Sequence, residues 1–160
     1  MNQMKIVQQD FDINTVLNKP LMAHLSSLGN SGPCSSPIWF IYEENKIWLF
    51  GLDTDSFIKR LIKHNKCALS IVDFNLKNGI LQHVGIRGVA IVNDIDEQRL
   101  HRFVSKYLGH DNKNWNQWFV NNVVNPLNRM VAIIPDTLVA KDVSYFKTEP
   151  DMASNSNSHE

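Results

Sequence analysis

Residues 53 to 60 hold the side chains of this chain that are best suited to bind an anion. Thr54 and Ser56 offer hydroxyl groups where a helix is predicted to begin, and the first backbone N–H groups of a helix have no partner within it. Lys59 and Arg60 follow one turn further on, close enough to fold back over a bound phosphate. This pattern is consistent with a phosphate site at the start of the helix.

Two acidic residues in the same segment support a simpler interpretation. Asp53 and Asp55 carry charges that also stabilise a helix start, and they would repel a phosphate placed there. A solvated amphipathic helix with an acidic cap explains the spacing equally well. On spacing alone this second interpretation is favoured, and the first stays open.

Metal binding and nucleophilic catalysis have little support in the sequence. The six histidines form no HExxH motif or paired spacing and no CxxC motif is present, so we expect no metal site. Cys34 would need a nearby base to act as a nucleophile, and the alternative is a small, half-buried side chain. The chain has no GxSxG, Walker or GxGxxG sequence, which excludes the usual hydrolase elbow and nucleotide-binding loops.

Arg87 is a charged residue within an otherwise apolar predicted strand. Because side chains alternate along a strand, Val84 and Ile86 share one face, and Arg87 points outward on the other. The alternative is a guanidinium that reaches an anion across the sheet surface. Tryptophans either stack on a flat heterocycle or fill a core or a dimer interface, and the chain has four: Trp39, Trp48, Trp115 and Trp118.

The elements that position these residues follow the order strand, tight turn, strand, short helix and strand. Aromatic and β-branched residues predict strands at 37–42 and 46–51, which the short segment between them joins as a hairpin. Apolar residues at helical spacing then predict a helix over 57–62, before residues 67–74 return to a strand.

The other predicted elements surround this central run. Their order along the chain is a helix at 11–17, a strand at 21–28, a turn at 29–33, a strand at 81–92, helices at 96–108 and 114–124, and a last strand pair at 129–134 and 138–146, interrupted at Pro135. Connections this short favour hairpins over parallel crossovers. We therefore expect a mainly β fold with flanking helices, built on a six-stranded antiparallel barrel. Residues 1–147 form one predicted domain, and 148–160 a disordered tail.

Composition restricts the partners and the compartment. The chain has 160 residues, enough for one well-packed domain, and its 16 basic and 16 acidic side chains cancel. We therefore expect no binding to nucleic acid or to a membrane surface, and local geometry must hold any anion. No segment resembles a signal peptide or a membrane span, so the cytoplasm is the expected compartment.

The succession of motifs resembles a known family across roughly residues 10 to 147. The run SPIWFIYEENKIWLFGLDTDSFIKRLIKHNKCALSIVD is followed by HVGIRGVAIVND, a helix ending KYLG, and MVAIIPDTLVAKDVSYF. This order is similar to that of the FMN-binding split-barrel proteins related to pyridoxamine 5′-phosphate oxidase. The resemblance implies a six-stranded split barrel that forms a homodimer, with FMN in the grooves between subunits. Some family members bind a deazaflavin or haem instead.

The resemblance also implies where the cofactor lies. Pro37 to Phe40 and Phe50 to Leu52 would line the flavin ring, a Thr or Ser and a Lys or Arg near the next helix would hold the phosphate, and a polar residue would approach the flavin from a later strand. The implied cofactor-binding residues in this chain are Pro37, Ile38, Trp39, Phe50, Gly51, Leu52, Thr54, Ser56, Lys59 and His83.

The sequence departs from the family in two places. Gly51, Asp55 and Phe57 stand at the usual Thr, Ser and Lys positions of the phosphate site when the segment is aligned without gaps. The segment after Tyr145 lacks the Arg-Leu-x-Pro ending that grips the substrate of the vitamin oxidase. We therefore do not predict pyridoxal phosphate synthesis.

Three functions follow from the resemblance. The leading hypothesis is an FMN-dependent oxidoreductase of unknown small-molecule substrate, with NAD(P)H as a candidate electron donor and no compelled acid or base. The second is a flavin-binding or cofactor-free protein that stores or senses without turnover. Haem binding ranks third, because no histidine is a clear axial ligand.

Overall fold

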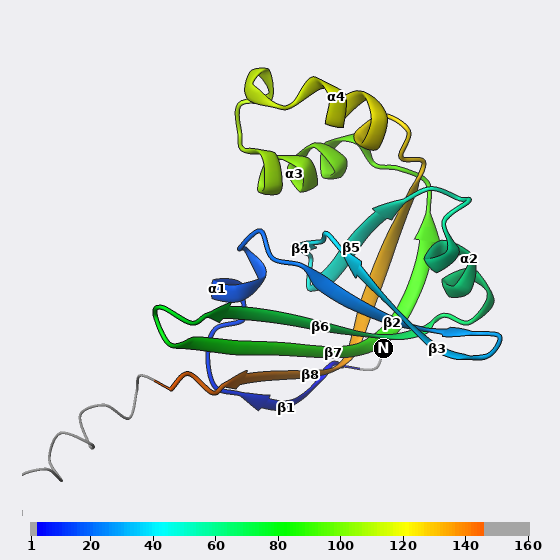
Figure 1. Ribbon diagram of the computed structural model, residues 1–160. Coiled ribbons are helices and arrows are strands. Elements are labelled where there is room, and N and C mark those ends of the chain that lie inside the picture. Colours follow the sequence, from blue (N-terminus) through cyan, green and yellow to red (C-terminus); the bar gives the residue numbers. More distant parts are fainter. Residues whose placement is uncertain (1–2, 146–160) are drawn as a thin grey trace, which may run out of the picture.

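Eight strands form a single twisted sheet in the computed structural model, which describes residues 3 to 145. Seven of them follow the path β3-β2-β6-β7-β8-β5-β4 with antiparallel neighbours, and β1 pairs in parallel with β8 (Figure 1). The strands are β1 (Lys5–Gln9), β2 (Ala23–Gly29), β3 (Gly32–Ile38), β4 (Ile41–Glu43), β5 (Lys46–Gly51), β6 (Lys66–Asn75), β7 (Ile80–Asn93) and β8 (Arg129–Asp142).

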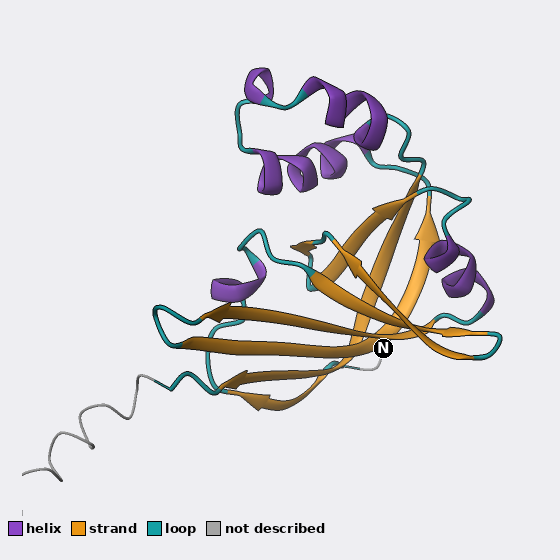
Figure 2. Cartoon of the chain, in the orientation of Figure 1, coloured by secondary structure: helices purple, strands orange, loops and turns teal. Residues whose placement is uncertain are grey.

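Helices cover the sheet at one end and at its side. Figure 2 shows α3 and α4 together beyond one end of the strands, and α2 beside the sheet. The helical segments are α1 (Asn14–Leu17), α2 (Ser56–Lys63), α3 (Glu97–Leu108), the 3-10 turn η1 (Asn112–Asn114), α4 (Gln117–Phe119) and the π-helical turn η2 (Val120–Val124). The carboxylate of Asp96 accepts N–H groups of the first turn of α3, which fixes where that helix begins.

The predicted fold class is confirmed. The protein is mainly β, with an antiparallel sheet that curls into a split barrel and helices on its flanks. The strand count is eight instead of six, and two differences from the predicted ranges contribute. Strand β1 was not predicted, because all five of its residues are exposed and show no alternation. The predicted strand at 37–42 is divided between the end of β3 and β4, with Trp39 and Phe40 between them.

One prediction based on proline was correct in part and one was wrong. The chain turns at Asn30 and Ser31, within the predicted turn at 29–33, but Pro33 continues the β2–β3 ladder, in which it pairs with Leu28. An edge strand tolerates the missing N–H group, and β3 ends the sheet path. The predicted break at Pro135 is absent, since β8 is continuous. Asp136 forms a bulge there, because Thr137 pairs with Arg87 while Pro135 pairs with the next residue of β7.

Strand β5 is buried on both faces, and this places the α3–α4 helices. Ile47 and Leu49 point into the barrel core, where they pack among the strands and α2. Trp48 and Phe50 point to the other side and pack in a second core with Phe103 and other residues of α3. The helices after β7 therefore bury the outer side of β5 and create a second layer over it.

Two further observations complete the architecture. In residues 3 to 145, no helix is both long enough and apolar enough to cross a membrane. The predicted tail at 148–160 lies outside the described residues.

Candidate functional site

An apolar pocket of about 300 Å³ lies between the barrel and the helical layer. The end of β3 and the adjoining Trp39 supply one wall, β5 the floor, and α3 with the η2 turn the opposite wall. We call this the apolar pocket; its lining is Met22, Pro37, Ile38, Trp39, Phe50, Phe103, Val104, Phe119, Val123, Val124 and Leu127. None of these side chains carries a titratable group, so the pocket suits a flat, apolar part of a ligand.

Aromatic contacts hold the walls of the apolar pocket in place. Trp39 stacks on Tyr107, with ring centroids 4.2 Å apart and an interplanar angle of 1°. Its ring also lies 5.3 Å from that of Phe119, and Phe50 lies 4.5 Å from Phe103. Pairs of this kind stabilise specific ring geometries beyond simple burial. The apolar pocket is therefore a preformed structure with fixed aromatic walls.

Two polar side chains of α3 anchor the chain beside Trp39. The hydroxyl of Tyr107 accepts the Phe40 N–H at 3.0 Å and donates to the Leu21 carbonyl oxygen at 2.7 Å. The ammonium of Lys106 donates to the carbonyl oxygens of Leu17 and Phe40 and lies 3.6 Å from the centre of the Phe40 ring. Burial lowers the pKa of Lys106 to about 7 and raises the pKa of Tyr107 to about 12.

The sequence did not reveal the role of Lys106. Lysines at the end of an amphipathic helix usually lie in solvent and favour the negative end of the helix dipole. Only the packing of α1 and the Phe40 segment against α3 surrounds this side chain with carbonyl groups. No local pattern encodes that contact.

A second pocket, of about 330 Å³, is lined by basic side chains of α2 and by the β2–β3 hairpin. We call this the basic pocket; its lining is Leu28, Gly29, Asn30, Cys34, Ser56, Lys59, Arg60 and Lys63. Its lining contains three cations and no carboxylate. Two of these cations donate hydrogen bonds to neutral oxygens: Lys63 donates to the Asn30 side chain at 2.8 Å, and Arg60 donates to serine hydroxyls. The basic pocket therefore favours an anionic ligand.

One face of β3 contributes a residue to each of the two pockets. Cys34, Ser36 and Ile38 are the half-buried positions that alternate with exposed residues along this strand. Cys34 lines the basic pocket and Ile38 the apolar pocket, while Ser36 accepts a hydrogen bond from Arg60. Four residues of strand span about 13 Å. The arrangement suits an elongated ligand with a flat apolar end and an anionic end.

The position that holds the cofactor phosphate in the family that the sequence resembles is filled here by side chains of the chain itself. A Cβ atom on Gly51 would lie 2.7 Å from Cζ of Phe57 and 2.9 Å from Oδ2 of Asp55. The Asp55 carboxylate also accepts the backbone N–H of Leu52 at 2.8 Å. An aromatic ring and a carboxylate do not fit a phosphate, so the residues at this position are unsuited to the phosphate of FMN.

The structure divides the predicted site residues into several groups. Pro37, Ile38, Trp39 and Phe50 meet in the apolar pocket. Ser56 and Lys59 line the basic pocket.

The remaining predicted residues lie outside both linings. Gly51 ends β5 beneath Phe57, and Leu52 follows it. Thr54 is exposed. His83 lies on the outer face of β7, where Nε2 is 3.1 Å from the hydroxyl oxygen of Ser70.

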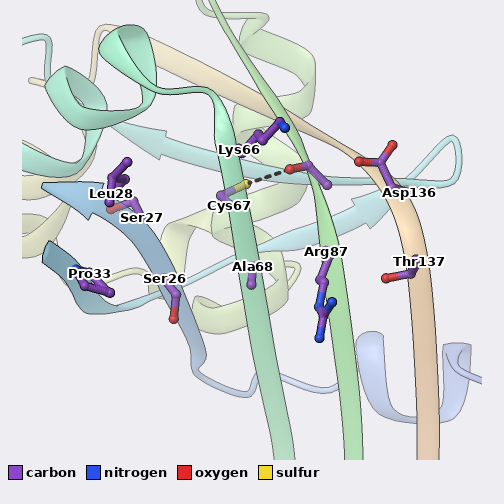
Figure 3. Close-up of a pocket in the computed structure, with 11 residues that line it drawn as sticks. Ser26, Ser27, Leu28, Pro33, Lys66, Cys67, Ala68, Arg87, Asp136 and Thr137 are labelled. Atoms are coloured by element: carbon purple, nitrogen blue, oxygen red, sulfur yellow. Dashed lines mark hydrogen bonds between the residues drawn. The ribbon is translucent and has the colours of Figure 1, made fainter.

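The outer face of the sheet carries a broad third hollow of about 490 Å³ (Figure 3). Arg87 projects from β7 beside Ala68, and Lys66 and Asp136 lie further along the same hollow. Val84 and Ile86 are buried while Arg87 is exposed, which confirms the outward-facing interpretation of Arg87. Within residues 3 to 145, no three His, Cys, Asp or Glu side chains are close enough to share a metal ion.

No family model and no curated protein matches the sequence. Solved structures do share the fold. A conserved hypothetical protein, Rv2991 from Mycobacterium tuberculosis, is 20% identical with a TM-score of 0.66, and the match covers 89% of each chain. A FAD-binding protein from Mesorhizobium loti is 13% identical with a TM-score of 0.60, covering 85% of this chain and 96% of that one.

A third similar structure bears on the family resemblance. A protein from Listeria innocua, provisionally assigned as a pyridoxamine 5′-phosphate oxidase, is 12% identical with a TM-score of 0.57. The match covers 83% of this chain and 96% of that one. At these identities the similarity establishes the shared fold. The relation to the resembled family is therefore structural.

Proposed function

We propose that this protein binds a flavin nucleotide, with FMN as the cofactor, and uses it as an oxidoreductase acting on a small molecule. One observation carries the proposal: a single face of β3 contributes Ile38 to an aromatic, apolar pocket and Cys34 to a basic pocket. Along the strand these two residues are about 13 Å apart, which is comparable to the length of a flavin nucleotide. FMN combines a flat ring system with an anionic phosphate, and each pocket matches one of these two parts.

The ring of the flavin belongs in the apolar pocket. Ile38 and Phe50 offer apolar contact, and Trp39 is already fixed by its stacking on Tyr107. Rigid walls reduce the ordering cost of binding, since the side chains do not have to be immobilised by the ligand. The FAD-binding protein with the same fold supports a flavin as the ligand.

The phosphate belongs in the basic pocket. Ser56 offers a hydroxyl and Lys59 a charge, and both line that pocket. The position used in the resembled family does not fit, because Phe57 and Asp55 fill it. Thr54 lines neither pocket and stays a prediction from the sequence.

A bound flavin supplies hydride and electron transfer. The chain's own residues orient the ring, exclude water from one of its faces and neutralise the phosphate. The apolar pocket offers no acid or base, so proton transfer to the substrate would have to come from solvent or from the substrate itself. NAD(P)H is the proposed electron donor.

We further propose that the protein is a homodimer, as the resemblance implies. The outer face of the sheet supports this, because Ala68, Ser70 and Gly85 are small and half-buried there, with Ser70 opposite Gly85 and Ala68 opposite Arg87 on β6 and β7. Small side chains permit close approach of a second copy. His83 lies on that same face, where it would approach the site of the partner subunit. Ala68→Glu is expected to give monomers in analytical ultracentrifugation, and an unchanged mass would exclude this face.

The second candidate is flavin binding without turnover. The absence of any titratable side chain from the apolar pocket favours it, because storage or sensing requires no proton transfer. Haem binding is not proposed, since no histidine lines either pocket.

Absorption spectroscopy tests the proposal. The purified protein, or the protein titrated with FMN, should show the two visible bands of a flavin, and quenching of flavin fluorescence should saturate at one FMN per chain. Failure of FMN to bind at any accessible concentration would refute the proposal. Anaerobic addition of NADH or NADPH separates the two candidates, because a reductase bleaches the bound flavin and a storage protein leaves it oxidised.

A further inference from the structure

Arg60 is an arginine without a carboxylate partner, and neutral side chains hold it in one orientation. Its Nε donates to the Ser27 hydroxyl at 2.8 Å and one of its terminal nitrogens donates to the Ser36 hydroxyl at 3.2 Å. Ser27 is only 4% exposed, so its side of this contact is shielded from bulk solvent. No ion pair to Arg60 is found in the described part of the chain.

The unused donors of Arg60 belong to the basic pocket. A guanidinium has five N–H donors in a rigid fork, and the two serine bonds use two of them. The side chain lines the basic pocket beside Lys59 and Lys63, and the pocket lining contains no carboxylate to consume the remaining donors. A guanidinium with free donors and a fixed plane is the group that best binds a phosphate through two oxygens.

The position of Arg60 explains how this chain can bind a phosphate despite its departures from the resembled family. Phe57 replaces the usual lysine on α2, and Arg60 lies three residues further along, on the same side of the helix. The anion site is therefore displaced by one turn of α2, away from Asp55 and toward the β2–β3 hairpin.

We infer that Arg60, together with Lys63, is the phosphate clamp of this protein and makes it select a phosphorylated flavin over riboflavin. The inference rests on the proposed function and names the group that sets cofactor choice. Lys63 supplies a second charge from the next turn of α2, and Asn30 holds it at the rim of the basic pocket.

The test compares FMN with riboflavin, which has the same ring but no phosphate. Wild-type protein, Arg60→Gln, Ser36→Ala and the control Lys113→Ala are titrated by flavin fluorescence. Lys113 is exposed and lies in the helical layer, outside the basic pocket. Arg60→Gln should weaken the affinity for FMN about 10- to 100-fold and leave the affinity for riboflavin unchanged, since it removes a charge-assisted contact to the phosphate. Ser36→Ala keeps the charge of Arg60, so it should reduce the FMN affinity by a smaller factor and leave the riboflavin affinity unchanged. Lys113→Ala should change neither affinity.

Three results distinguish the outcomes. An unchanged FMN affinity in Arg60→Gln overturns the inference while leaving the proposed function intact. Equal losses for both flavins also overturn it, because they indicate a disturbed fold. If wild-type protein binds neither flavin, the proposed function fails, and inorganic phosphate then becomes the probe in isothermal titration calorimetry. Binding of phosphate by wild type and its loss in Arg60→Gln would support the clamp by itself, whereas no binding would overturn it.

Discussion

The buried ammonium of Lys106 gives the protein a distinct dependence of stability on pH. Burial lowers the pKa of this group to about 7, whereas a lysine in the unfolded chain titrates near 10.4. Between these values the unfolded chain binds the proton and the native protein does not. The free energy of unfolding therefore rises with pH, by at most about 1.4 kcal/mol per unit. Integrated from pH 7 to pH 9, this single group contributes about 2 kcal/mol.

Lys106→Met removes this dependence and is measured by urea unfolding at several pH values between 7 and 9. The quantity of interest is the difference in free energy of unfolding between wild type and variant, because other groups cancel in it. Cys67 is one such group, since burial raises its pKa to about 11. We expect the difference to grow in favour of wild type by about 2 kcal/mol across this range.

The absolute stability of Lys106→Met has two opposing contributions. Methionine avoids the desolvation of a charge, but it leaves the carbonyl oxygen of Leu17 without its donor. The change with pH in the difference between wild type and variant reports the titration of Lys106, and so separates it from these two contributions. Lys106→Arg serves as the control, because arginine keeps its charge throughout the range. A difference between wild type and Lys106→Met that does not change with pH would refute the assigned environment of Lys106.

Three further predictions concern stability. Arg99→Met should lower the free energy of unfolding, measured by urea unfolding, by about 3 kcal/mol. The buried guanidinium of Arg99 pairs with Glu43 and lies 3.7 Å from the ring centre of Trp48. A loss of less than about 1 kcal/mol would contradict this. Glu43→Gln should have a lower free energy of unfolding than wild type at neutral pH, and this difference should disappear as pH falls below about 4.3. Hydrogen bonds from arginines, Arg102 first, lower the pKa of Glu43, and the stabilisation they provide is lost when the carboxylate is protonated. A difference that stays the same during acid denaturation would contradict this. Gly88→Ala should lower the free energy of unfolding by about 3 kcal/mol, since the added Cβ would lie 2.2 Å from a backbone oxygen of β8. In Gly85→Ala the added Cβ would meet only the movable imidazole of His83, so this variant should lose less stability. Thermal denaturation compares the two variants.

The central part of the fold was predictable because its local signals agree with one another. Glu44 and Asn45 adopt positive φ angles of 55° and 57° in the predicted tight turn, and helix α2 begins one residue before the predicted helix. Each element is short and follows the last without a spacer, so few alternative pairings exist. Where turn chemistry and strand patterning conflict, the sequence misleads. Pro33 and Pro135 both indicate breaks, yet an edge strand and a bulge accommodate them.

The two pockets were only partly predictable. The aromatic residues of β5 indicated burial, but the contact between Phe50 and α3 depends on helices more than fifty residues away in the sequence. Arg60 was visible beside Lys59 as a charge on a helix. Its orientation by Ser27 and Ser36 arises only from the packing of α2 against the β2–β3 hairpin. Spacing along one element reveals which residues share a face, and tertiary contacts decide which of them face a ligand.

A crystal structure of the protein saturated with FMN would locate both parts of the cofactor. We expect density for the isoalloxazine ring in contact with Ile38 and Phe50, and for the phosphate beside Lys59 and Arg60. A ring bound elsewhere, or a phosphate at the position filled by Phe57 and Asp55, would contradict it.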